Sequence, residues 1–375
     1  MKIAIEAQRI FRKNKHGMDF VVLEILKILQ IKDKVNEYFV LVSPGEDKCL
    51  ESSSSFNIIE FGSTFYPLWE QIQLPLKLRK ILPDILHCTS NTAPFVKCSV
   101  KLVTTIHDVI YLEKEKESNS SWYQMLGRIY RRFVVPTIAK SSNIIITVSE
   151  FEKKSIVLHF PSKERNIEVI YNGYGTHFKE NIDWEKIVKK YSDAQQYFLF
   201  LGNTDPKKNV ATTLIAYHKY LQSSKIKHKL LIADLKAYAF EQFIVANKIE
   251  SIRESVSLIS YIPNSDLAHF YNGAYALLYT SKRESFGIPI LEAMACGTPV
   301  ITGISSAMPE VAGSGCKTLV DTLSSDSIAA KMLELENSAD FYKEVVEYGK
   351  TRVKEFSWEK AAQQTQILYQ KVYEL

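Results

Sequence analysis

The sequence predicts an α/β protein built from two doubly wound domains with parallel sheets. Short β-rich runs alternate with segments of helical periodicity, an order typical of parallel sheets covered by helices on both faces. This series occurs twice, and a chain of 375 residues is long enough for two hydrophobic cores. A hydrophobic content of 46% and a charged content of 24% are ordinary for a globular protein and argue against disordered, collagen-like and coiled-coil classes.

The first series runs through the N-terminal half of the chain. Its helical segments are residues 19–29 and 121–141, which have apolar residues at helical spacing. Its expected strands are residues 2–7, 37–43, 57–61, 85–88, 100–108 and 143–150.

The second series begins at residue 197. Its expected helix is residues 209–221, and its expected strands are residues 197–203, 229–234, 256–260, 275–280 and 299–302. The strand pattern lapses near residues 176–196, which places the boundary between a first domain of residues 1–178 and a second of residues 179–355. Ligands of open parallel sheets bind beyond the carboxyl ends of the strands, so two such Rossmann-like domains facing each other would form a cleft.

The start of the chain and its cysteines indicate the compartment. The apolar run at the start is shorter than a signal peptide requires, and no stretch reaches the roughly 18 apolar residues of a spanning helix. We therefore expect a cytoplasmic protein. The cysteines are scattered without a CxxC pair, which argues against a disulfide framework and a zinc site; they are Cys49, Cys88, Cys98, Cys296 and Cys316.

Positive charge is concentrated in the first domain. Lys and Arg outnumber Asp and Glu by five over residues 1–180 and balance them over the rest of the chain. Basic clusters lie at residues 9–15 and 128–132. They form either a solvated face or a surface that attracts an anionic membrane or a phosphorylated acceptor. No nucleic-acid-binding module is visible.

The segment of residues 279–302 carries the most chemical information. A strand ends at its start, a loop with Gly287 follows, and Pro289 begins a helix that Gly297 ends. The helix start offers backbone N–H groups beside Phe286 and Gly287, an arrangement suited to a phosphate. The absence of a side chain at Gly287 would allow the anion to approach the backbone closely.

Two carboxylates flank this expected anion site. Glu284 precedes the helix and Glu292 lies one turn inside it. Carboxylates accept hydrogen bonds from paired hydroxyls, such as those of a sugar and a ribose. The structural alternative is a solvent-facing Glu284 and a Glu292 that only favours the helix dipole.

Three further candidate positions lie at the end of a predicted strand or in the loop after one. Lys208 precedes the helix of residues 209–221 and could neutralise a diphosphate, whereas Lys207 is expected to be exposed. An isolated Lys pair is more often solvated surface. His107 lies at the end of the strand of residues 100–108 and is either a structural histidine or a site residue. Gly17 could admit a ligand to the backbone.

In these segments the chain resembles the retaining glycosyltransferases of family 4, which have the GT-B architecture. The run ESFGIPILEAMACGTPVI matches the E-x7-E signature, with Glu284 and Glu292 as the two acids. The resemblance extends over nearly the whole chain, including residues 69–88, 104–111, 147–156, 172–178, 202–209, 260–281 and 308–313. It implies a terminal segment, residues 356–375, that packs back on the N-terminal domain.

The resemblance also implies roles for particular residues. Catalytic roles fall on Glu284, which would contact the donor sugar hydroxyls, on His107 near the transferred sugar, and on Lys208 at the diphosphate. Transfer would retain the anomeric configuration, with no bound metal and no cofactor apart from the nucleotide-sugar co-substrate. The residues expected to bind the donor are Gly17, Asn203, Lys208, Phe286, Gly287, Ile288 and Glu292, the last at the ribose.

The chain departs from the family pattern in three places. The N-terminal loop has one glycine, between His16 and Met18, and Asp19 would place a negative charge near the phosphates or the acceptor. Asn203 stands where many relatives have Arg. Asp234 stands where Gly is common.

These observations predict a retaining glycosyltransferase that moves a sugar from a UDP- or GDP-linked donor to a saccharide or lipid-linked saccharide. The expected role is surface polysaccharide assembly, with a peripheral contact at the inner face of the cell membrane. Two alternatives stay open: an epimerase or phosphorylase of the same architecture, and a catalytically silent protein that binds nucleotide-sugars.

Overall fold

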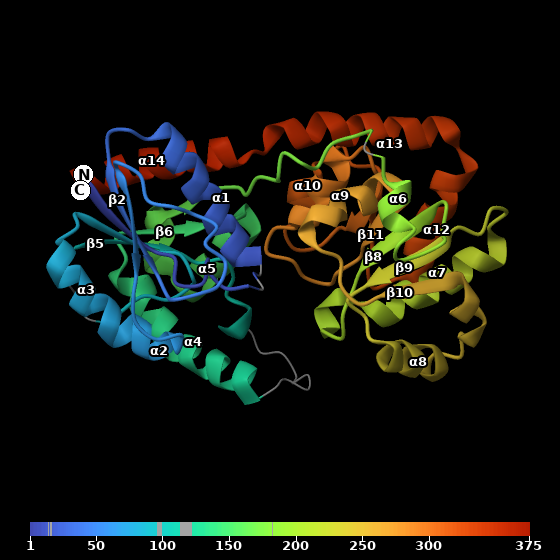
Figure 1. Cartoon of the computed structure of the whole chain (residues 1–375). Helices are drawn as coiled ribbons and strands as arrows, with labels where there is room; N and C mark the ends of the chain where they lie inside the picture. The colour runs from blue at the N-terminus through green and yellow to red at the C-terminus, as the bar shows by residue number, and fades with distance from the viewer. Residues whose placement is uncertain (14, 16, 96–99, 113–121, 182) are drawn as a thin grey trace. The chain divides into compact units, whose positions relative to one another are not determined.

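The computed structural model describes residues 1–375 except residues 14, 16, 96–99, 113–121 and 182, with only the backbone for residues 122–125 (Figure 1). Contacts divide the chain into two compact units. Unit 1 is Met1–Gly173 with Ser357–Leu375, and unit 2 is Tyr174–Phe356. Residues 174–178, assigned above to the first domain, group with unit 2, where the Phe178 ring packs 5.8 Å from the Tyr271 ring.

Unit 1 contains a parallel sheet in the order β3-β2-β1-β4-β5-β6-β7 over its described residues. The chain moves outward from β1 to β3 and then returns to the other side of β1 with β4, so the switch point lies between β1 and β4. The strands are β1 Lys2–Glu6, β2 Glu37–Val42, β3 Phe56–Glu60, β4 Ile85–Cys88, β5 Lys101–Thr105, β6 Ile144–Thr147 and β7 Ile167–Val169.

Helices cover both faces of this sheet because its side chains alternate between the two faces. Ala4 and Leu86 of the sheet share a core with Trp69 and Leu78 of the helical segment 69–81. On the opposite face, α1 (Gly17–Lys32) packs against the terminal helix α14 (Trp358–Glu374) (Figure 1). The other helices are α2 Tyr66–Leu68, a π-helical turn Trp69–Gln73, α3 Leu74–Ile81, α4 Trp122–Ser141 and α5 Glu150–His159.

Unit 2 repeats the same topology. Its described parallel sheet has the order β10-β9-β8-β11-β12-β13, which places the switch point between β8 and β11. The strands are β8 Tyr197–Leu201, β9 Lys229–Ala233, β10 Val256–Ile259, β11 Ala274–Tyr279, β12 Val300–Gly303 and β13 Leu319–Val320.

The core of unit 2 forms where helices pack on the sheet through side chains such as Phe198, Leu230 and Met332. Serine hydroxyls cap some of the helix starts; Ser324 and Ser338, for example, each accept a backbone N–H three residues on, at 3.2 Å. The helices are α6 Glu185–Val188, α7 Val210–Ser223, α8 Ala237–Ala246, α9 Asn264–Gly273, α10 Ile288–Ala295, α11 Met308–Ala312, α12 Ser325–Asn337 and α13 Ala339–Arg352. Short 3₁₀ segments are Ile110–Leu112, Pro161–Asn166, Pro206–Lys208, Glu250–Ser255 and Val353–Glu355.

The predicted fold class is confirmed. The differences concern short strands, element ends and several helices that the sequence analysis did not place, such as α12 and α13. The strands β7 and β13 were not predicted, because two or three residues are too few to show a pattern. The strands predicted for residues 100–108 and 143–150 end at Thr105 and Thr147, so His107 lies in the loop beyond the strand. Helix α10 begins at Ile288, one residue earlier than predicted.

The structure also describes the state of the cysteines and the length and apolar character of the helices. Cys49, Cys88, Cys296 and Cys316 are free, and Cys98 lies outside the described residues. Within the part of the chain that the structure describes, no helix is both long enough and apolar enough to cross a membrane.

Candidate active site

Two loops meet at the switch point of unit 2. The loop after β8 contains the 3₁₀ turn Pro206–Lys208, and the loop after β11 contains Glu284. Because β8 and β11 are adjacent parallel strands, their carboxyl ends lie at the same edge of the sheet. This is the place where doubly wound folds bind ligands.

Lys208 and Glu284 form an ion pair across these loops. Lys208 Nζ lies 2.8 Å from Glu284 Oε1, with the two side chains 20% and 15% exposed. The ammonium also lies 5.5 Å from the centre of the Tyr279 ring. Burial acts to raise the pKa of Glu284, but the charge of Lys208 and hydrogen bonds from Lys208 and Ser281 outweigh it and lower the pKa. Glu284 is therefore ionised at neutral pH.

Hydrogen bonds within and between the loops hold Lys208 in place. The carboxylate of Asp205 accepts the backbone N–H of Lys207 at 3.0 Å, and Asn203 Oδ1 accepts the backbone N–H of Asp205 at 2.9 Å. The backbone N–H of Lys282, in the opposite loop, donates to the carbonyl of Lys207 at 2.8 Å. Asn203 thus shapes the turn that carries the two lysines.

Asn209, directly after Lys208, ties the turn to the sheet. Its backbone adopts the left-handed conformation, with φ of 59°, which Asn tolerates better than most residues. Its buried amide Nδ2 donates to the carbonyls of Thr280 at 3.0 Å and Thr322 at 2.6 Å. The sequence analysis did not identify this residue, and an Asn before a helix gives no signal that separates a positioning role from an ordinary cap.

The N-terminus of α10 follows Glu284. Gly287 is the residue before the helix and has φ of 108°, a conformation that L side chains rarely adopt. The first N–H groups of a helix have no intrahelical partners, and Gly287 supplies no side chain to cap them. The half-buried Ile288 starts the helix, and Phe286 is buried. This terminus has the polarity and backbone geometry of an anion site.

Glu292 lies inside α10 with its side chain buried. Its Oε2 accepts the hydroxyl of Tyr271 at 2.9 Å. Burial raises the pKa of Glu292 to about 7, against the lowering effect of this hydrogen bond. Tyr271, which the sequence analysis did not single out, is therefore the partner that orients this carboxyl group.

His107 lies in unit 1, in the loop after β5. Asn91 Oδ1 accepts its backbone N–H at 2.6 Å, and its Nε2 lies 3.0 Å from the carbonyl oxygen of Thr89. A carbonyl accepts only, so Nε2 carries the ring proton. Burial lowers the pKa of His107, which keeps the imidazole neutral.

Gly17 and the departures from the family pattern have local explanations. Gly17 begins α1, and a Cβ built there would meet nothing within 4 Å. Asp19 is buried and forms an ion pair with Arg12, which compensates the negative charge expected near the site. His16 lies outside the described residues. Asp234 has φ of 67°, the left-handed conformation that explains why glycine suits this position.

The structure therefore brings together Lys208, Glu284 and the start of α10 at one edge of one sheet. Asn203 and Glu292 belong to the same two segments, whereas His107 and Gly17 belong to unit 1. Within the described residues, no group of three or more His, Cys, Asp or Glu could hold a metal ion.

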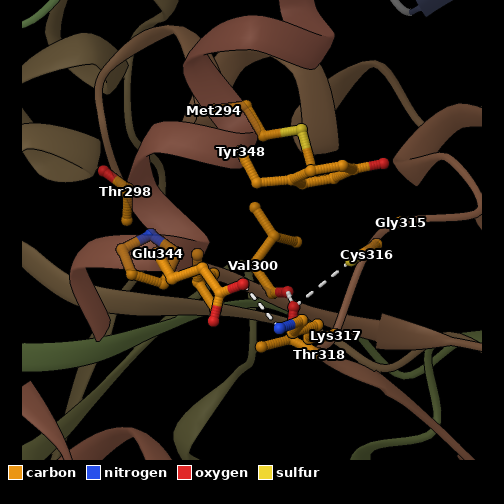
Figure 2. A pocket seen from close by; sticks show the side chains of 11 residues that line it. Met294, Thr298, Val300, Gly315, Cys316, Lys317, Thr318, Glu344 and Tyr348 are labelled. Carbon is orange, nitrogen blue, oxygen red and sulfur yellow. Dashed lines mark hydrogen bonds and ion pairs between the residues drawn. The ribbon is translucent and has the colours of Figure 1, made fainter. Parts of the chain in front are cut away.

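A pocket elsewhere in unit 2 is separate from this edge. Figure 2 shows it lined by Met294, Val300, Cys316 and Tyr348, with the ion pair of Lys317 and Glu344 beside it. Val300 is the first residue of β12, so the pocket lies toward the amino ends of the strands. The switch-point residues are at the carboxyl ends.

This chain has two doubly wound units, and one of them has a cation and a helix N-terminus at its switch point. These features are typical of two-domain α/β enzymes that bind nucleotides. Sequence comparison gives the family. The model described as "Glycosyl transferases group 1" matches residues 181–352, and the model described as "Glycosyltransferase Family 4" matches residues 36–178. The chain belongs to family 4 of the glycosyltransferases, and it is a glycosyltransferase of the GT-B type.

Individual relatives are distant. O-antigen chain mannosyltransferase B of Escherichia coli is 27% identical over 271 residues, which is 71% of this chain and 69% of that protein. O-antigen chain mannosyltransferase RfbU of Salmonella typhimurium is 28% identical over 57% of this chain and 59% of its own length.

Solved structures share the fold at low identity. Sucrose-phosphate synthase from Thermosynechococcus elongatus has a TM-score of 0.76 at 17% identity and covers 100% of this chain and 99% of its own. HepE of Anabaena, solved in complex with UDP, has a TM-score of 0.72 at 15% identity and covers 99% of this chain and 100% of its own. Both are similar to this chain in their whole architecture.

Proposed function

We propose that this glycosyltransferase moves a hexose from a nucleoside-diphosphate-sugar to a saccharide or lipid-linked saccharide, with retention of the anomeric configuration. The observation that carries the proposal is the ion pair of Lys208 and Glu284, 2.8 Å apart beside the N-terminus of α10. A nucleoside-diphosphate-sugar has an anionic diphosphate and adjacent sugar hydroxyls. The cation and the helix start suit the first, and the carboxylate suits the second.

The charges of the site suit the chemistry of the leaving group. In the proposed reaction the bond between the anomeric carbon and the diphosphate oxygen breaks, and its electron pair stays with the diphosphate. Lys208 and the backbone N–H groups at Gly287 and Ile288 would stabilise that charge. Loss of one such contact costs roughly 2–4 kcal/mol in the reaction barrier. We propose that Lys208 supplies the positive charge in this role and that no metal ion takes part.

The acceptor completes the reaction from the same face. Its hydroxyl oxygen forms the new bond to the anomeric carbon, and its proton passes to a phosphate oxygen of the donor. Glu284 would hold the sugar hydroxyls during this step, and Glu292 would accept hydrogen bonds from the ribose. For His107 we retain the role implied by the family resemblance, a contact with the transferred sugar.

The relatives suggest the substrates. Mannose is the sugar named for both O-antigen relatives, and UDP is the nucleotide bound in the HepE structure. We therefore propose a GDP- or UDP-linked hexose as donor, with mannose first among the candidates. The acceptor would be a growing surface polysaccharide at the inner face of the cell membrane.

A donor panel tests the proposal. The purified chain is incubated with GDP-mannose, UDP-glucose and related donors and a short saccharide acceptor, with and without EDTA. Release of nucleoside diphosphate and the anomeric configuration of the product are followed by NMR. We expect one donor class to react with retention in the presence of EDTA. Saturable donor binding without any release would instead indicate a silent binding protein, and an inverted product would contradict the proposed mechanism.

A further inference from the structure

Two helical segments of unit 1 expose large apolar side chains at helical spacing. Along residues 65–76 and along α4 these positions recur every three or four residues, which places each set on one helix face. Their exposed fractions run from 38% for Leu68 to 74% for Phe133. We call this set the α2–α4 surface; it consists of Phe65, Leu68, Ile72, Leu76, Leu126, Ile129 and Phe133.

The opposite faces of the same segments are already packed. Trp69, Leu74 and Val134 are buried together in one core of unit 1. The hydroxyl of Tyr130 in α4 lies 2.8 Å from Gln71 Nε2, so the two segments lie side by side, as Figure 1 shows for α2 and α4. The exposed apolar residues are therefore a second face of helices whose inner face is complete.

The exposed charges of the two helical segments themselves have one sign. Within residues 65–81 and 122–141 the basic residues are Lys77, Arg79, Lys80, Arg128, Arg131, Arg132 and Lys140. The acidic residue of these ranges is Glu70, which is fully buried and accepts hydrogen bonds from Tyr66 at 2.7 Å and Thr92 at 2.5 Å. No acidic side chain of these two ranges is thus available to repel an anionic partner.

We infer that the α2–α4 surface docks unit 1 on an anionic lipid bilayer. Exposed apolar patches of this kind mark interaction sites, and apolar side chains flanked by Lys and Arg are the pattern of helices that lie in the membrane interface. The apolar side chains enter the boundary between head groups and acyl chains. The cations pair with lipid phosphates and carboxylates. The inference rests on the proposed function for its purpose, since a lipid-linked acceptor is presented at such a surface.

Vesicle binding of the full chain tests the inference. Cosedimentation is measured with vesicles of phosphatidylcholine and with an equimolar mixture of phosphatidylcholine and phosphatidylglycerol. We expect binding to the anionic vesicles that weakens at high salt. Three variants of the α2–α4 surface should each bind about ten-fold more weakly than the wild type. They are Ile72→Ser/Leu76→Ser, Arg79→Glu/Lys80→Glu and Phe133→Ser.

Matched controls come from α5 of the same unit. Leu158 is 79% exposed but lies outside the α2–α4 surface, so Leu158→Ser should leave vesicle binding unchanged. Lys153→Glu/Lys154→Glu is the corresponding charge control. Circular dichroism and hydrolysis of the donor in solution show that each variant is folded and active.

Three results would overturn the inference. The first is absence of wild-type binding to anionic vesicles. The second is equal loss in the α5 controls. The third is a wild-type dimer that the surface variants convert to monomers, because the surface would then bind a second copy of the chain. Vesicle binding with no turnover of any donor would refute the proposed function and leave the docking surface intact.

Discussion

Lys208 Nζ lies 2.8 Å from Glu284 Oε1 although 76 residues separate the two in the chain. The pair exists because β8 and β11 are neighbours in the sheet of unit 2, so the loops that follow them meet. Although burial of the carboxyl group acts in the opposite direction, the ammonium lowers the pKa of the carboxyl group.

Glu284→Ala should abolish most of the transferase activity. The variant removes the carboxylate proposed to hold the sugar hydroxyls and frees Lys208 from its partner. We expect kcat to fall roughly 10²–10³-fold, as for the loss of one well-placed polar contact in a transition state. The variant also leaves the mostly buried Lys208 without its partner, so the melting temperature should fall, and circular dichroism shows whether the variant is still folded at the assay temperature.

A surface ion pair of unit 2 provides the control for this variant. Glu241 pairs with Arg253 at 2.8 Å, with side chains 46% and 51% exposed. Exposed pairs contribute little to stability, so Glu241→Ala should keep wild-type kcat. Equal activities of the Glu284 variant and the wild type would refute the assignment of Glu284.

Glu292→Gln should stabilise the protein in alkaline solution. The folded-state pKa of about 7 lies above the ordinary 4.5, so the folded protein binds more protons than the unfolded chain between these values. The free energy of unfolding contributed by this group therefore falls as pH rises through this window, by roughly 3 kcal/mol. Glutamine keeps an acceptor for Tyr271 without the charge. The melting temperature of the variant should exceed that of the wild type at about pH 8 and match it at about pH 4.5.

The same titration should govern donor affinity. The ionised carboxylate accepts hydrogen bonds from two ribose hydroxyls, whereas the protonated group must donate one of its own. Donor affinity of the wild type should therefore rise with pH through about 7, the pKa of Glu292. Isothermal titration with the nucleotide across this range checks the trend. The affinity of Glu292→Gln should be lower and flat with pH, and a slope in the variant equal to that of the wild type would assign the titration to another group.

Gly287→Ala should weaken the start of α10. At φ of 108° an alanine is strained, and its Cβ would lie 3.1 Å from Ile290 Cδ1. We expect a loss of about 1–3 kcal/mol in the free energy of unfolding, measured in urea. Gly17→Ala is the control, because Gly17 has neither a positive φ nor a close neighbour. Equal effects of the two variants would show that the conformation of Gly287 is not special.

Much of the fold could be predicted because local residue patterns indicate the individual strands and helices. The strand of residues 2–7 and the helix of residues 19–29 appear as β1 and α1, since buried strands and amphipathic helices have characteristic periods. The π-helical turn Trp69–Gln73 could not be predicted in this way. Its buried Glu70 depends on Thr92 and Tyr130, which lie 22 and 60 residues away in the chain.

In the candidate site, too, features set by neighbouring residues could be predicted, whereas contacts between residues far apart in the chain could not. The phosphate-binding potential of the start of α10 follows from Gly287 and Pro289, which are close in the sequence. The contact of Lys208 with Glu284 follows only from the order of the strands. The ion pair of Asp19 with Arg12 was also hidden, because the intervening loop gives no periodic pattern that would bring the two together.

Nucleotide binding by two neighbouring lysine variants tests the central claim most directly. Lys208→Ala and Lys207→Ala remove the same charge from adjacent positions, but Lys207 is 40% exposed and points to Asp205 rather than to Glu284. Calorimetric titration of each with GDP and UDP should show an affinity roughly 10–100-fold below the wild type for Lys208→Ala and unchanged for Lys207→Ala. Equal affinities of the two variants, or no binding of either nucleotide by the wild type, would contradict the proposed diphosphate site.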